Sequence, residues 1–166
     1  MSNKALFFDR DGTLNVDVHY LHKIEDFKWI NGAPEAIRYA NEKGYLVIVV
    51  TNQSGIARGY FTEDDVHALH DYMNECLEKY GAHIDDFYYC PHLVDGKVKS
   101  YAIDCDCRKP KPGLIERAIK EHDIDRSASL LIGDGDRDIE AAQAAHVRGV
   151  KYTGGSLLTL VKECLD

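Results

Sequence analysis

Two aspartates in the segment FFDRDGTLN (residues 7–15) could do chemistry. Asp9 and Asp11 stand one residue apart, directly after an apolar run. Two carboxylates held that close repel each other unless a cation or a proton lies between them. The segment is therefore either an ordinary acidic turn or part of a metal site.

A second acidic stretch, GDGDRDIEAA (133–142), also follows an apolar run. It places Asp134 directly after that run and Asp138 four residues further on. Mg²⁺ prefers carboxylates, waters and phosphate oxygens, so Asp134 is a candidate ligand. Asp138 could bind the metal or support it from behind, whereas Asp136 would project into solvent. An acidic helix N-terminus, which the helix dipole favours, is the alternative for Asp136 and Asp138.

The same acids suit phosphoryl transfer. Asp9 could attack phosphorus as a covalent nucleophile, and Asp11 could protonate the leaving oxygen and later accept a proton from water. Such a transfer needs donors and positive charge around the phosphoryl oxygens. The segment TNQSG (51–55) offers hydroxyl and amide groups, and Lys109 offers a charge. Arg108 has the planar fork that a second phosphate or a sugar would need. Taken alone, these segments would be an ordinary turn and a basic surface loop.

Three cysteines and a histidine gather in CPH (90–92) and CDC (105–107). Three thiolates and an imidazole form a closed tetrahedral set, which is typical of structural zinc. We therefore expect Zn²⁺ to pin a loop over about residues 90–107, held by Cys90, His92, Cys105 and Cys107. Incidental thiols are the alternative, and the close clustering of four soft ligands argues against it.

These residues must be positioned by regular elements, and apolar runs alternate with helical patterns along the chain. Strands are predicted at 4–9, 45–52, 87–90 and 129–134, helices at 33–43, 62–79, after Pro112 and from about Arg137, and a strand and a helix at the end. This alternation predicts an α/β fold with a parallel sheet covered on both faces. Ligands gather outside the carboxyl ends of such strands, where three of the polar sets above would meet.

Composition limits the possible partners. The 166 residues suffice for one domain, and the net charge of -8 argues against nucleic acid or an anionic membrane as a partner. No apolar run approaches the roughly 18 residues of a membrane span. The start MSNKALFF reaches an acid too soon for a secretory signal, which favours the cytoplasm. We expect a monomer.

Four segments resemble the ordered motifs of the haloacid-dehalogenase-like phosphohydrolases. They are DRDGT (9–13), TNQSG (51–55), KPKPG (109–113) and GDGDRD (133–138). The resemblance implies a single hydrolase domain over 1–166, with a Rossmann-like sheet, Mg²⁺ and an aspartyl-phosphate intermediate. By position, Asp9 is the nucleophile and Asp11 the acid and base, while Thr51 and Lys109 stabilise the phosphoryl group. Asp134 joins Asp9 and Asp11 at the Mg²⁺.

A finer resemblance is to the D-glycero-D-manno-heptose 1,7-bisphosphate 7-phosphatases. It rests on NVDVHYLHKI (15–24), VVTNQSGIARGYFT (49–62), YYCPH (88–92) and CDCRKPKPG (105–113). Those enzymes have no large cap; a zinc loop and a short flap, here about residues 15–28, border the pocket. The resemblance implies removal of the 7-phosphate on the route to nucleotide-activated heptose for surface polysaccharide. It implies substrate contacts by Asp17, Val18, His19, Tyr20, Thr51, Asn52, Gln53, Ser54, Arg108 and Lys109.

Two positions depart from that pattern, and three other functions stay open. Gly135 stands where heptose enzymes can carry a lysine, and His19 replaces a small flap residue. Histidinol-phosphate phosphatases share the zinc pattern, but their loop is usually shorter than the twelve residues between the two pairs here. A phospho-accepting signalling domain would need neither a second aspartate nor a zinc loop. An inactive zinc-stabilised binding module is the last alternative, although none of the expected catalytic residues is missing.

Overall fold

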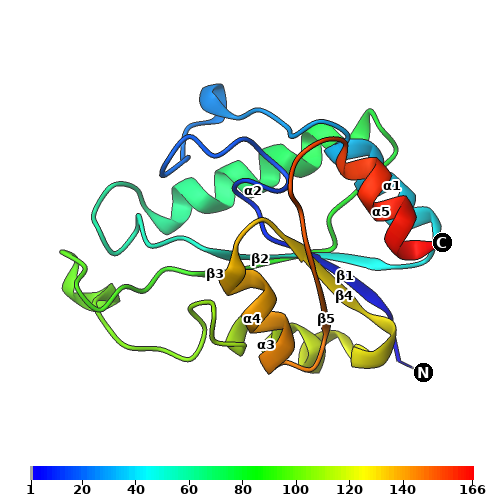
Figure 1. Cartoon of the computed structure of the whole chain (residues 1–166). Helices are drawn as coiled ribbons and strands as arrows, with labels where there is room; N and C mark the ends of the chain where they lie inside the picture. Colours follow the sequence, from blue (N-terminus) through cyan, green and yellow to red (C-terminus); the bar gives the residue numbers. More distant parts are fainter. Residues whose placement is uncertain (1) are drawn as a thin grey trace.

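Five parallel strands form the central sheet in the computed structural model, which describes residues 2–166 (Figure 1). The strands are β1 (Ala5–Phe8), β2 (Leu46–Asn52), β3 (Asp86–Cys90), β4 (Leu130–Gly133) and β5 (Arg148–Lys151). Their order across the sheet is β3-β2-β1-β4-β5. The predicted α/β fold with a Rossmann-like parallel sheet is confirmed.

The chain changes direction across the sheet at β1. This strand pairs with β2 on one side, where Phe8 faces Val49, and with β4 on the other, where Phe8 faces Ile132. Connections from the two sides leave the sheet in opposite directions here, which opens a crevice at the carboxyl ends of the strands. The segment after β1 therefore enters the natural ligand position of this topology.

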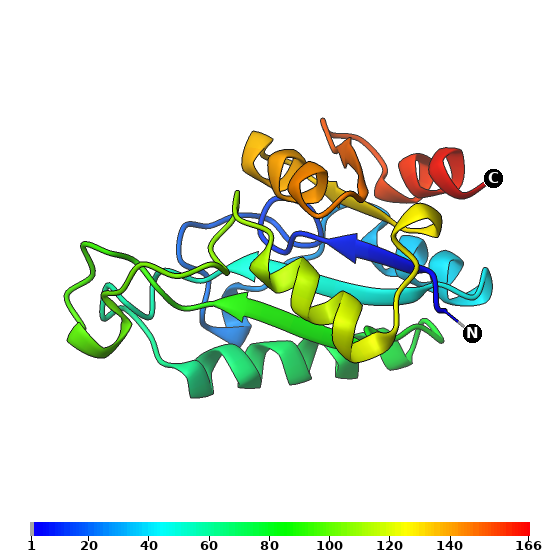
Figure 2. The ribbon, with the colours of Figure 1, turned by 90° about the horizontal axis from the view of Figure 1, so that it is seen from below.

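Two layers of helices enclose the sheet. They are α1 (Ala33–Glu42), α2 (Glu63–Glu78), α3 (Gly113–His122), α4 (Asp136–Ala144) and α5 (Leu157–Leu165). In Figure 1, α1, α2 and α5 lie above the sheet and α3 and α4 below it, and Figure 2 shows α3 and α4 from below. The sheet has an apolar core on each face. Successive side chains of β1 point to opposite faces, so Leu6 and Phe8 belong to one core and Ala5 and Phe7 to the other.

The predicted element boundaries agree with the structure to within one or two residues. Helix α2 begins as its sequence indicated, with Thr62 and Asp65 forming a reciprocal capping box. Three short 3-10 helices, at 24–26, 99–101 and 126–128, were not predicted. Three-residue turns are too short to show a hydrophobic period. Among residues 2–166, none of the helices combines the length and apolar character that a membrane crossing requires.

Two long connections lie at the carboxyl edge of the sheet, and the described chain holds no separate cap domain. One connection runs from β1 to α1 and contains the predicted flap; the other runs from β3 to α3 and contains the cysteine cluster. Both lie beside the ends of β1 and β2 (Figure 2). Both contribute residues to the cavity at this edge, Asp17, His19 and Tyr20 from the first and Arg108 and Lys109 from the second.

Candidate active site

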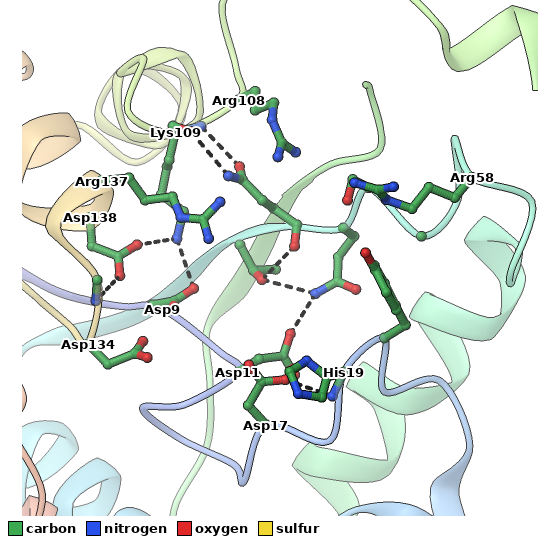
Figure 3. Close-up of a pocket in the computed structure, with 17 residues that line it drawn as sticks. Asp9, Asp11, Asp17, His19, Arg58, Arg108, Lys109, Asp134, Arg137 and Asp138 are labelled. Atoms are coloured by element: carbon green, nitrogen blue, oxygen red, sulfur yellow. Dashed lines mark hydrogen bonds and ion pairs between the residues drawn. The ribbon is translucent and has the colours of Figure 1, made fainter. Parts of the chain in front are cut away.

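A cavity of about 310 Å³ opens at the carboxyl ends of β1, β2 and β4. Its size suits a small molecule. Of the residues predicted from the sequence, it is lined by Asp9, Asp11, Asp17, His19, Tyr20, Thr51, Asn52, Gln53, Ser54, Arg108, Lys109 and Asp134. Figure 3 shows how the parallel sheet brings these distant segments to one place.

Lys109 lies at the floor of the cavity and is almost completely buried, with 3% exposed. Its ammonium donates to Asp9 Oδ1 at 2.8 Å, to Asp138 Oδ1 at 2.6 Å and to the carbonyl of Val50 at 2.9 Å. Burial lowers the pKa of Lys109, but the charges of Asp9 and Asp138 outweigh burial and raise it overall. The lysine is therefore held as a cation beside the expected nucleophile.

The carboxyl group of Asp9 keeps only 13% of its side chain exposed. Burial raises its pKa to about 8, Lys109 opposes that effect, and the charge of Asp138 adds to it. A cation bound at this carboxylate would favour its ionised form. The position is thus suited to a buried nucleophile that works together with a metal.

Three carboxylates could share a metal ion: those of Asp9, Asp134 and Asp138, which have oxygens within 4.8 Å of one another. Asp138 is already occupied, because it pairs with Lys109 and accepts from the backbone amide of Gly135 at 3.1 Å. It supports the site from behind, which was one of its two expected roles. Asp9 and Asp134 are left with oxygens that suit Mg²⁺.

The carboxylate of Asp11 does not join that group. Arg10 donates to both of its oxygens at 3.1–3.3 Å, and Asn15 and Gln53 each donate at 3.0 Å. The carboxylate of Asp11 is thus engaged by these donors and not grouped with those of Asp9 and Asp134, and its predicted place at the Mg²⁺ stays a prediction. Arg10, a buried cation, holds the Asp11 carboxylate in this position, and no local sequence pattern indicated that pairing.

Gly12 allows Asp134 to reach the site. A Cβ atom at Gly12 would lie 2.3 Å from Asp134 Oδ2, and its φ of +88° is one that side chains rarely adopt. Thr13 then donates its hydroxyl to Asp134 Oδ1 at 3.1 Å. The glycine of the DRDGT segment thus provides the space in which the carboxylate after β4 meets the loop after β1.

Residues 51–53 have two distinct tasks. The side chain of Asn52 forms a pair of hydrogen bonds with the backbone of Lys109, at 3.0 and 3.2 Å. It therefore positions the lysine segment. Thr51 accepts from Gln53, which also donates to Asp11. The strand end thereby connects the predicted phosphoryl-binding residue to the predicted acid.

The flap turns sharply beside the cavity. The amide of His19 donates to Asp17, which leaves Val18 at the apex of the turn with 44% exposed. Val18 is the one expected substrate contact that the structure does not place in the cavity lining. His19 and Tyr20 both have positive φ angles, 57° and 61°. Tyr20, which lines the cavity, packs edge-on against Tyr60.

Three guanidinium groups surround the cavity, from Arg58, Arg108 and Arg137 (Figure 3). Arg58 Nε and Arg108 Nη1 are buried without a hydrogen-bond partner. Burial lowers the pKa of Arg108, and the charges of Arg137 and Arg58 lower it further. Arg58 and Arg137 were not predicted from the sequence. Their positions shortly after β2 and Asp134 were the available signal, although many surface arginines share it.

The cysteine cluster forms beside this site as predicted. Cys90 Sγ lies 3.5 Å from Cys105 Sγ and 3.0 Å from Cys107 Sγ, and His92 Nδ1 lies 3.5–3.6 Å from Cys107 and Cys90. Zn–S bonds of about 2.3 Å place two sulfurs of a tetrahedral site roughly 3.8 Å apart. These side chains could therefore close around Zn²⁺ with small shifts. The pKa of the Cys107 thiol is raised, mainly by its hydrogen bond to Cys90 and by burial, an effect that a bound cation would oppose.

Comparisons with known proteins agree with this geometry. A family profile described as HAD-hydrolase-like matches residues 106–159. The chain is 49% identical to the D-glycero-beta-D-manno-heptose-1,7-bisphosphate 7-phosphatase of Pasteurella multocida, over 87% of this chain and 78% of that one. It is 45% identical to the enzyme of the same name from Rhodopseudomonas palustris, over 97% and 89%.

Two solved structures have the same fold. A HAD-like phosphatase from Mesorhizobium loti aligns with a TM-score of 0.87 at 33% identity, covering 99% of this chain and 86% of that one. The D,D-heptose 1,7-bisphosphate phosphatase of B. bronchiseptica, complexed with magnesium and phosphate, aligns with a TM-score of 0.81 at 27% identity, covering 98% of both chains. Together with the sequence relatives, these similarities show that the chain belongs to the haloacid-dehalogenase-like hydrolases, among the phosphatases named for heptose 1,7-bisphosphate.

Proposed function

We propose that this chain removes the 7-phosphate of D-glycero-D-manno-heptose 1,7-bisphosphate, leaving the 1-phosphate on the sugar. The observation that carries this choice is a group of arginines, beside the Asp9–Lys109 pair, that have no carboxylate partner among residues 2–166. Arg58, Arg108 and Arg137 line the same cavity as that pair. A substrate with two phosphates would place one beside Asp9 and the other among the arginines.

The reaction needs two displacements at phosphorus. Asp9 attacks the 7-phosphate, the bond from phosphorus to the sugar oxygen breaks, and Asp11 gives that oxygen a proton. Water then attacks the phosphoaspartate and loses a proton to Asp11, and the bond from phosphorus to Asp9 breaks to release phosphate. Mg²⁺, held by Asp9 and Asp134, would supply charge that offsets the repulsion between carboxylate and phosphate. Lys109 stabilises the phosphoryl oxygens.

The arginines favour a second anion because none of the three forms an ion pair within residues 2–166, although Arg58 also lies over the ring of Tyr20, 5.5 Å from its centroid. Among residues 2–166, four arginines pair with carboxylates, namely Arg10, Arg38, Arg117 and Arg126. The other four are Arg58, Arg108, Arg137 and Arg148, and three of these line one cavity. Buried donors without partners are costly, and a phosphate can accept from several at once. Arg137, two residues after Gly135, would supply the positive charge that position 135 lacks.

The positive charge of these arginines also distinguishes hydrolysis of the heptose bisphosphate from hydrolysis of histidinol phosphate. Histidinol phosphate carries a cationic amine where the bisphosphate carries a second anion. Unpaired guanidinium groups repel an amine and attract a phosphate. The arginine set therefore supports the bisphosphate as the substrate.

Steady-state phosphate release tests the proposal. The kcat/KM values for both anomers of the heptose bisphosphate should exceed that for histidinol phosphate. Both anomers belong in the test, because a relative named for the alpha anomer is also 44% identical to this chain. A hundredfold preference for histidinol phosphate would overturn the proposal. A long-lived phosphoprotein formed from acetyl phosphate without turnover would favour a signalling domain.

An arginine variant tests the second anion directly. Arg137→Gln should lower kcat/KM for the bisphosphate by about tenfold to a hundredfold, since a charged hydrogen bond is lost. The value for heptose 7-phosphate, which lacks the second anion, should change much less. Arg148→Gln is the matched control, because Arg148 is an exposed arginine outside the cavity. Equal losses on both substrates would assign Arg137 to the reacting phosphate instead.

We further propose Mg²⁺ as the catalytic metal and a structural Zn²⁺ at Cys90, His92, Cys105 and Cys107. A single hydrolase domain over 1–166, a monomeric state and a cytoplasmic location complete the proposal. Elemental analysis of the purified protein tests the zinc, and activity after dialysis against a chelator, with and without added Mg²⁺, tests the magnesium. Light scattering tests the monomer, and cell fractionation tests the location.

A further inference from the structure

Arg10, which stands between Asp9 and Asp11 in the sequence, is a fully buried cation. One edge of its guanidinium faces Asp11, with Nε 3.3 Å from Oδ1 and Nη2 3.2 and 3.1 Å from the two carboxylate oxygens. Nη2 also donates to the carbonyl of Leu21 at 3.3 Å. Because a guanidinium is rigid and planar, whatever fixes its other edge also fixes its contact with Asp11.

His70 fixes that other edge. Its Nε2 lies 3.2 Å from Arg10 Nη1. An arginine can only donate, so Nε2 must accept and the histidine must be neutral, with its proton on Nδ1. Burial, together with the charge of Arg10, lowers the pKa of His70 to about 2, which agrees with the neutral form.

The histidine itself is held rigidly, although it lies on α2, far from the site in sequence. Its ring stacks on Phe87 with centroids 4.2 Å apart and planes 10° from parallel. It also meets Tyr89 edge-on at 6.3 Å, and only 4% of the residue is exposed. Strand β3 thus supports His70, His70 supports Arg10, and Arg10 supports Asp11.

We propose that His70 is a positioning residue for catalysis: by accepting from Arg10, it holds the guanidinium edge that aims the carboxyl group of Asp11 for proton transfer. This inference rests on the proposed acid and base role of Asp11. Asn15 and Gln53 also donate to Asp11, but Arg10 alone contacts both of its oxygens with a charged group. Displacement of Arg10 would therefore rotate the acid away from the leaving oxygen.

Two substitutions of His70 distinguish the effect of its hydrogen-bond acceptor from the effect of its aromatic ring. His70→Phe keeps a ring that can stack on Phe87 but removes the acceptor, whereas His70→Gln can restore an acceptor near the position of Nε2. The readout is the single-turnover rate of Asp9 phosphorylation, with Mg²⁺ present, from a sugar phosphate and from p-nitrophenyl phosphate. Nitrophenolate leaves without a proton and a sugar alkoxide needs one, so a misplaced acid slows the sugar phosphate selectively.

His70→Phe should slow phosphorylation by the sugar phosphate at least tenfold more than phosphorylation by p-nitrophenyl phosphate, and His70→Gln should recover most of the loss. His67→Phe is the matched control: this histidine is exposed on the same helix and contacts Tyr89, not Arg10, so its rates should stay unchanged. If His70→Phe does not fold, His70→Asn replaces it, because its shorter side chain cannot bring an acceptor to Arg10.

Comparison with Asp11→Asn distinguishes failure of the inference from failure of the proposed function. If Asp11→Asn slows the sugar phosphate selectively and the His70 variants do not, the positioning role is overturned while the role of Asp11 stands. If Asp11→Asn itself shows no selectivity, the proposed acid role fails, and the role of His70 fails with it. Equal losses on both substrates in His70→Phe would show a purely structural histidine.

Discussion

The ammonium of Lys109 lies 2.8 Å from the carboxylate of Asp9, although one hundred residues separate them in the chain. It lies still closer to Asp138, at 2.6 Å. Once Asp9 carries a phosphoryl group, Asp138 can still hold the lysine as a cation and in place. The buried pair therefore explains how the same charge could serve both displacement steps.

Replacement of Lys109 should lower both stability and activity, and a second substitution should restore only part of the stability. Lys109→Met leaves the carboxylates of Asp9 and Asp138 without their cation, and we expect a loss of about 3–5 kcal/mol in the free energy of unfolding, with no measurable turnover. Adding Asp138→Asn should recover part of the stability, because one uncompensated charge is removed, but no activity. Denaturant unfolding and phosphate release measure the two effects. A stable and active Lys109→Met protein would contradict the assignment.

Gly12, which lies where the loop after β1 meets Asp134, offers a steric test of the site. Gly12→Ala forces a Cβ atom against Asp134 Oδ2, so we expect weaker Mg²⁺ activation and at least a tenfold lower kcat. Gly81→Ala is the matched control, because Gly81 also has a positive φ, +66°, but open space around it. Both variants should lose about 1 kcal/mol from backbone strain, Gly12→Ala should lose more because of its contact with Asp134, and only Gly12→Ala should lose activity. Similar activities of the two variants would show that the position of the Asp134 carboxylate does not depend on the space at Gly12.

Loss of the zinc ligands should affect stability before chemistry. Cys107→Ser removes one thiol from the cluster, and we expect a lower zinc content and a lower Tm, while the remaining folded protein keeps much of its kcat. Cys76→Ser, in helix α2 and away from the cluster, should change neither zinc content nor activity. Atomic absorption and thermal unfolding measure these outcomes. A zinc-free parent protein with the same Tm would refute the structural role.

The stability of the fold should fall below pH 6.5 because of His70. The unfolded chain binds a proton there below a pKa of about 6.5, whereas the folded protein resists protonation down to about 2. The unfolded state therefore binds more protons as the pH falls, and stability decreases by about 2 kcal/mol between pH 6.5 and 5 from this group. His70→Gln should remove that part of the slope. Urea unfolding of both proteins at pH 7 and pH 5 would reveal it; parallel slopes would contradict a neutral His70.

Local sequence patterns sufficed for the elements and for most of the residues that meet in the cavity. The apolar run before Asp9 and the capping residues Thr62 and Asp65 each act on neighbours within a few positions, so their structural effect is readable from the chain. The cysteine spacing was informative for the same reason, since CPH and CDC each place two ligands within three residues. A parallel sheet then brings the ends of β1, β2 and β4 together without further information.

Only the tertiary structure decided which charges pair. Arg10 could have faced solvent as an ordinary loop residue, but in the fold it is buried between Asp11 and His70, sixty residues away along the chain. Arg58 and Arg137 likewise become partners of one cavity only when α4 and the loop after β2 meet at the sheet edge. A side chain's local pattern sets which element it belongs to, whereas its electrostatic partner depends on distances through space that no local pattern contains.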